Sequence, residues 1–356
     1  LIKMSLVAAV AVAGFSSTVA AKPLEEAIKN VDVSGMIRLR FDAQQNDTDA
    51  TDTTSDFDTD ITFKSKISDD STAVIKIEAD KKVDTDTTKA TRLNAELSLA
   101  YLSTKFDATT VSVGRQGIPG PFDDAQGGDG IIASTPIGSL TAVGGFFTTT
   151  SGDGVADGKD AYELALLGQA GPVAFDIFYA NVSNIVALTS LHASTNIEGI
   201  TIDARHTVGT LDGDVATEDK DASLTKIVAT GNAGMVNFLA GFAFTGEDND
   251  ENNGANRIAL DDDADADADL IVEQASLGGL SDAKAVVVGA GVTVNNVDLG
   301  AKYLYARYDD ANDDRTTADE YLLEASYPLD TNLVDSGAST DDNDQTFTRL
   351  EVKYTF

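Results

Sequence analysis

Apolar and polar residues alternate along most of this chain with a period of two. From Val31 to Phe41 most of the odd positions are apolar. The even positions between them include Arg38 and Arg40. In a β-strand, successive side chains point to opposite faces of the sheet. The pattern therefore predicts strands that have one apolar and one polar face.

The same alternation recurs to the end of the chain. We expect strands at 31–42, 61–68, 73–80, 93–102, 109–114, from 131 onward, and at 140–147, 162–167, 173–179, 185–191, 197–206, 224–230, 235–245, 285–294, 297–308, 321–327, 332–339 and 346–356. Some connections are short, such as Asp107–Ala108 and Asn295–Asn296, and others are long and acidic, such as 43–58, 211–221 and 246–282. Short turns at one end and long loops at the other are typical of outer-membrane barrels, which favour even strand numbers. We expect an antiparallel barrel of about 18 strands, with 16 as the alternative.

A soluble β-sandwich is the main alternative fold, because its strands alternate as well. A sandwich packs large apolar side chains between two sheets. Here the inward-facing positions would carry charges, including Arg38, Lys64, Glu78, Glu96 and Lys302. Charged groups of this number line water more readily than a dry core. The polar faces therefore favour a barrel around water, with short periplasmic turns and long acidic extracellular loops.

Composition and the first residues limit the function further. With 25 basic and 59 acidic residues the net charge is −34, which excludes an electrostatic nucleic-acid binder. The chain has no cysteine, so disulfides and thiol chemistry are excluded. Lys3, the apolar run 6–15 and the small residues up to Ala21 predict a signal peptide over 1–21, although a buried helix is the alternative. The barrel is then expected over 22–356.

The last strand has a strongly two-sided pattern. Leu350, Val352, Tyr354 and Phe356 share one face, while Arg349 falls on the other. A terminal amphipathic strand that ends in Phe356 matches the strands read by the barrel assembly machinery of outer membranes. An unpaired edge with an aromatic end invites strand addition.

The segment 114–130 is rich in glycine, and it also carries two prolines and three aspartates, Asp123, Asp124 and Asp129. Glycine and proline at this density disfavour a regular element, so we expect a compact acidic loop.

A family resemblance appears at Pro23–Gly35 (PLEEAIKNVDVSG), which is similar to the mature start of the major outer membrane proteins of Campylobacter and its relatives. The run 99–116 resembles the strand pair of that family before its constriction loop, and 123–130 resembles the loop. The resemblance implies a trimeric, general-diffusion, cation-preferring porin of about 18 strands. It also implies a Ca²⁺ ion near the acidic loop, with Asp129 at the position of a calcium-ligating aspartate.

In such a porin the third long loop, here 115–130, folds into the lumen and narrows it. Its aspartates would then face a basic wall, and alternation directs the following residues into the lumen: Arg38, Arg40, Lys64, Lys66 and Arg349. Arg115 is a further candidate for the basic wall. Strict alternation turns Arg115 toward lipid, and a bulge would be needed to turn it inward. Opposed rows of charge would orient polar solutes and set ion preference.

The expected function is therefore passive diffusion of small polar solutes and cations across a membrane of outer-membrane lipid and lipopolysaccharide. An enzyme is not expected, since no Ser–His pair stands out and since Asp203 and His206 are three apart, on opposite faces of one strand. The alternative function is that of a structural outer-membrane protein or an adhesin whose surface loops bind external ligands.

Overall fold

The computed structural model describes residues 31–45, 51–84, 94–120, 127–151, 158–211, 220–246, 281–309, 315–329, 332–341 and 346–356. The expected signal peptide, 1–21, lies outside these residues, as do Asp123, Asp124 and most of the acidic segment 246–282. Within the described ranges, no helix is long and apolar enough to cross a membrane.

The described residues form eighteen strands, the larger of the two expected numbers. They are β1 (Val31–Gln45), β2 (Thr51–Lys66), β3 (Ser71–Asp84), β4 (Asn94–Phe106), β5 (Thr109–Gly117), β6 (Gly127–Ile137), β7 (Leu140–Ser151), β8 (Ala161–Ala170), β9 (Val173–Val182), β10 (Val186–Ile197), β11 (Ile200–Leu211), β12 (Lys220–Ala233), β13 (Val236–Thr245), β14 (Ser281–Val294), β15 (Val297–Asp309), β16 (Arg315–Leu329), β17 (Asn332–Asp341) and β18 (Thr346–Thr355).

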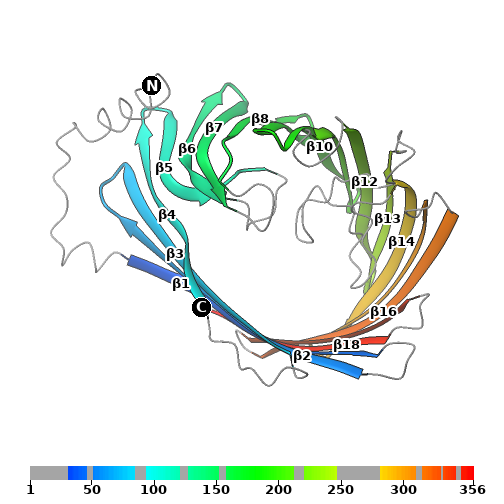
Figure 1. Ribbon diagram of the computed structural model, residues 1–356. Helices are drawn as coiled ribbons and strands as arrows, with labels where there is room; N and C mark the ends of the chain where they lie inside the picture. Colours follow the sequence, from blue (N-terminus) through cyan, green and yellow to red (C-terminus); the bar gives the residue numbers. More distant parts are fainter. Residues whose placement is uncertain are drawn as a thin grey trace.

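All strands belong to one antiparallel sheet in which each strand pairs with its neighbours in sequence. The first strand pairs with the last as well, over the register from Met36–Thr355 to Gln45–Thr346. The hydrogen-bonded order therefore returns to its starting point. Figure 1 shows the strands arranged around a central space, with β8 and β10 on the opposite side from β1, β2 and β18. A sheet of this kind satisfies its backbone groups internally, as a hydrocarbon environment requires.

The outer face of the sheet is apolar and exposed. Large side chains with two-fifths or more of their surface exposed occur in both halves of the ring, among them Phe41, Leu97, Leu164, Val288 and Leu323. Exposed apolar surface on this scale is unusual for a protein in water, but it suits a sheet that faces lipid.

Tight turns join the strands at one end of the sheet. Both residues of the turn between β14 and β15, Asn295 and Asn296, have positive φ, which is the conformation that two-residue hairpin loops require. Gly138, Gly171 and Gly234 provide positive φ in the turns after β6, β8 and β12. These connections confirm the predicted short turns.

Two predicted loops proved too long. The segment 43–58 was expected to be a loop, but β1 extends to Gln45 and β2 begins at Thr51. Threonine, serine and aspartate fill most of the start of β2, so the sequence there shows no apolar period. In the second case, the predicted loop 115–130 overlaps β5 and β6, which end and begin at Gly117 and Gly127.

Candidate functional site: the charged inner wall

Three arginines on the inner face of β1 and β18 form ion pairs across neighbouring strands. Arg38 Nη2 lies 2.8 Å from Oδ2 of Asp58 on β2. Arg40 Nε lies 2.8 Å from Oε2 of Glu351 on β18. These partners lie directly opposite each other in register, so the geometry of the sheet itself brings the charges together.

The third pair, Arg349 Nε to Asp42 Oδ1 at 2.9 Å, crosses the same β1–β18 seam. Across this seam Arg40 faces Glu351 and Asp42 faces Arg349, whereas Arg38 faces Lys353. The observed register therefore joins opposite signs at two of these three positions. A shift of two residues would set Arg40 against Arg349, where like charges repel.

These arginines of the predicted basic wall are thus paired with carboxylates, and their role at a constriction stays a prediction. Each of the three arginines has a carboxylate partner within 3 Å. The pairing of Arg38 with Asp58 was not predicted from the sequence, because Asp58 was expected to lie in a loop.

The two lysines of the predicted wall lie elsewhere. Lys64 and Lys66 are at the end of β2 that leads into the short turn before β3. Lys66 Nζ is 3.1 Å from Asp69 Oδ1 in that turn, and both side chains are largely exposed. Lys64 is exposed and lies opposite Asp32. The lysines are thus separated along the strand from the arginine pairs, and the role predicted for them in a constriction stays a prediction.

Arg115 and Asp129 are cross-strand neighbours on β5 and β6, and Arg115 Nη1 lies 3.8 Å from Asp129 Oδ1. By alternation they share the face of Val113 and Ile131, which is the outer face. Arg115 keeps the face that alternation along β5 gives it, although Gly114 has positive φ and the pairing of β6 with β7 shifts between Asp129 and Gly130. Asp129 belongs to a strand rather than to a loop.

The described residues near Asp129 do not fit a calcium site by themselves. Calcium takes six to eight oxygen ligands, and no group of three or more His, Cys, Asp or Glu side chains that could hold a metal ion occurs among the described residues. Asp129 instead has a guanidinium as its neighbour. The calcium expectation stays a prediction.

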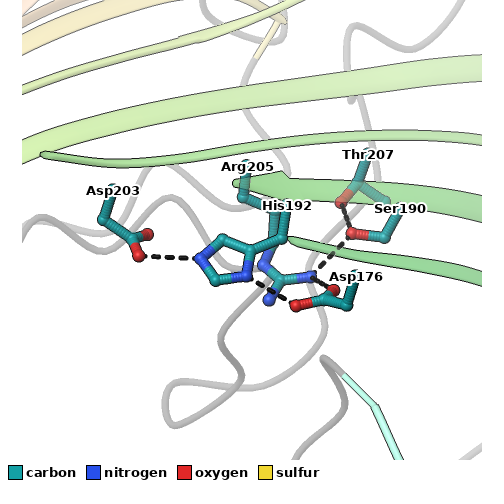
Figure 2. A network of polar contacts seen from close by, with 6 residues as sticks. All are labelled: Asp176, Ser190, His192, Asp203, Arg205 and Thr207. Atoms are coloured by element: carbon teal, nitrogen blue, oxygen red, sulfur yellow. Dashed lines mark hydrogen bonds and ion pairs between the residues drawn. The ribbon is translucent and has the colours of Figure 1, made fainter. Parts of the chain in front are cut away.

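A polar network on β9, β10 and β11 was missed by the sequence analysis (Figure 2). His192 Nδ1 lies 2.5 Å from Oδ2 of Asp176, and Nε2 lies 2.7 Å from Oδ2 of Asp203. Arg205 Nη1 is 3.2 Å from the other oxygen of Asp176 and donates a hydrogen bond to Ser190 Oγ at 3.0 Å. The three strands lie across the ring from β1 (Figure 1).

This network can hold charge but is not arranged as a nucleophile and base. Both ring nitrogens of His192 face carboxylate oxygens, and both donate only when the ring is an imidazolium. Ser190 Oγ contacts Arg205 and Thr207 rather than the imidazole. The prediction that Asp203 and His206 do not pair is confirmed by their partners, since Asp203 contacts His192 and His206 contacts Thr225.

A different part of the inner wall is apolar and inaccessible. Leu224, Ala243, Val287 and Leu304 form one packed cluster across β12–β15, and each has no more than 2% of its surface exposed. The side chains of the pairs on β1 and β18 are partly exposed, whereas this sector is packed and inaccessible.

Comparison with known proteins agrees with this architecture. Residues 1–163 match the family model described as Campylobacter major outer membrane protein. No curated protein sequence matches the chain.

Solved structures from two bacteria share the fold. OccAB1 of Acinetobacter baumannii has a TM-score of 0.77 at 12% identity, over 96% of this chain and 99% of that one. OccK5 (OpdH) of Pseudomonas aeruginosa has a TM-score of 0.73 at 14% identity, over 91% of this chain and 98% of that one. The outer membrane protein OpdK of Pseudomonas aeruginosa has a TM-score of 0.67 at 13% identity, over 91% of this chain and 99% of that one. At these identities the likeness concerns the fold. The chain therefore has the fold of outer-membrane β-proteins, and its first 163 residues are similar to the Campylobacter major outer membrane protein family.

Proposed function

We propose that this chain forms a water-filled, cation-preferring channel for small hydrophilic solutes and ions. The observation that carries the proposal is the arginine–carboxylate pairs on the inner face of a sheet whose outer face is apolar. Partly exposed charges need water, and the lipid-facing side of the same strands offers none. Family and fold point to a channel rather than to an enzyme.

Cation preference is the finer part of the proposal. Pairing leaves the arginine wall with little net charge, so cation preference would depend on exposed carboxylates elsewhere on the inner face, including Asp203, which contacts His192. Asp203 has 43% of its side chain exposed on the inner face. The chain as a whole is strongly acidic, which raises cation concentration near its surface.

Planar-bilayer recording tests both parts. Purified protein should give stable, salt-dependent conductance steps. In a salt gradient, the sign of the reversal potential should show that cations pass more readily than anions. A barrel that inserts without conducting would refute the channel and favour the structural or adhesin alternative. A reversal potential of the sign for anions would refute the cation preference alone.

Several expectations stay predictions. They are the homotrimer, the inward fold of the segment between β5 and β6, bound Ca²⁺, contact with lipopolysaccharide, and recognition of the last strand by the barrel assembly machinery. Three sub-levels in each conductance step would support the trimer.

A further inference from the structure

A recess of about 620 Å³ lies in the inner wall at the short-turn end of β10–β16. Its floor and sides come from several strands that are neighbours in the ring, including β12, β13, β14 and β16 (Figure 1). The recess begins where the inaccessible apolar cluster around Leu304 ends. On β14 the inward positions change from Val287 to Gly289 and Gly291, and on β15 they change from Leu304 to Lys302 and Gly300.

Glycines at inward positions produce the hollow. Gly291 lies opposite Gly300 in register, and Gly300 lies opposite Glu324. A Cβ atom on Gly300 would approach Oε1 of Glu324 to 2.4 Å. Because residue 300 has no side chain, the Glu324 carboxylate can lie across β15 and reach Lys302.

The lining contains neutral hydrogen-bonding groups and one adjacent pair of opposite charges. Amides and hydroxyls come from side chains such as Asn196, Thr201, Asn232 and Asn237. Lys302 Nζ lies 3.2 Å from Oε2 of Glu324, and both side chains are partly exposed at the edge of the recess. An ammonium and a carboxylate at this spacing are complementary to a small molecule that carries the same two groups on one carbon atom.

The charges discriminate between ligand classes. An anion would pair with Lys302 but would meet Glu324 and the nearby Asp298. A simple amine would pair with Glu324 and leave Lys302 without its partner. A zwitterion can satisfy both groups with charge-assisted hydrogen bonds, while the amides bind its remaining polar atoms.

We propose that this recess is a binding subsite for small zwitterionic solutes, of which free α-amino acids are the simplest class. The subsite deepens the proposed channel function and rests on it, since the solute must enter the lumen to reach the short-turn end. It gives the channel a point at which such solutes dwell, distinct from the arginine pairs of the opposite wall.

The test compares three matched probes: alanine, lactate, which lacks the ammonium, and alaninol, which lacks the carboxylate. Binding is read from saturation-transfer NMR on the detergent-solubilised protein, and from excess current noise in planar bilayers. Alanine should bind at least about tenfold more tightly than lactate or alaninol, because each of these leaves one charge unpaired.

Variants locate the site. Lys302→Gln and Glu324→Gln should each weaken alanine binding by about tenfold or more, and the exchanged pair Lys302→Glu/Glu324→Lys should recover most of it. Asp69→Asn, in an exposed turn at the same end of the barrel, is the matched control and should bind alanine as the unchanged protein does. Folding of each variant is checked by its heat-dependent shift in gel mobility.

Equal binding of the three probes, or unaltered alanine binding in the folded Lys302→Gln and Glu324→Gln variants, would overturn the subsite. Conductance without an alanine-dependent signal in either assay would overturn the subsite and leave the channel standing. A silent barrel would refute the channel, and the NMR measurement would still decide whether the recess binds alanine.

Discussion

The ion pairs at the β1–β18 seam lead to a quantitative prediction for Glu351→Gln. The substitution keeps the size of the side chain and one acceptor oxygen but removes the charge opposite Arg40. The guanidinium would then remain on the inner wall without its carboxylate, at the one junction that links the two ends of the sheet.

The magnitude follows from the exposure of the pair. The side chains of Arg40 and Glu351 are 26% and 13% exposed, so the pair is neither a surface pair nor a fully buried one. Exposed pairs contribute about 0–1 kcal/mol, and loss of one partner from a buried pair costs about 3–5 kcal/mol. We therefore expect Glu351→Gln to lower the free energy of unfolding by about 1–2 kcal/mol.

Asp69→Asn provides the contrast, since the Lys66–Asp69 pair is 54% and 92% exposed and lies in a turn. Its expected effect is below about 0.5 kcal/mol. Both variants would be unfolded by urea in lipid vesicles and followed by circular dichroism. The exchange Arg40→Glu/Glu351→Arg should restore part of the lost stability. Equal losses for Glu351→Gln and Asp69→Asn, or no rescue by the exchange, would refute the reasoning from burial and register.

Three further substitutions test other parts of the wall. Glu163 is 1% exposed, and neither of its carboxylate oxygens has a hydrogen-bond partner within the described part of the chain. Glu163→Leu should therefore raise the free energy of unfolding in urea by about 1–3 kcal/mol. A lower free energy of unfolding would contradict this reasoning. Gly300→Ala should lower stability by about 1–3 kcal/mol, because its Cβ would displace Glu324, and this loss should shrink in the Gly300→Ala/Glu324→Ala double variant. Asp203→Asn should reduce the proposed cation preference, which would be seen as a smaller reversal potential in a salt gradient. An unchanged potential would remove Asp203 from the selectivity mechanism.

Alternation alone was enough to predict the strands and the face of most side chains. The inward direction of Arg38 and Arg40 and the outward direction of Arg115 follow from a period of two, and the structure agrees. The period failed where both faces were polar. For this reason the start of β2, which holds Asp58, was predicted to be a loop.

The partners of the charged groups depended on register, which the sequence does not display. His192 lies sixteen residues from Asp176 and eleven from Asp203, and only the offset between β9, β10 and β11 brings them together. The cluster around Leu304 illustrates a second limit, because alternation assigns a residue to the inner face but not to water or to packed side chains.

The opposed signs within each arginine pair have a consequence for how the proposed channel would sort solutes. A pair of nearby opposite charges acts as a dipole, and the potential of a dipole decays faster with distance than that of a single charge. In the proposed channel, an ion on the axis of the lumen would feel little of the row formed by Arg38, Arg40 and Arg349. A solute in contact with the wall would meet strong local fields of alternating direction. Selection at this wall is then a matter of contact rather than of long-range attraction, so it should depend on the size and shape of the solute and be only weakly screened by salt.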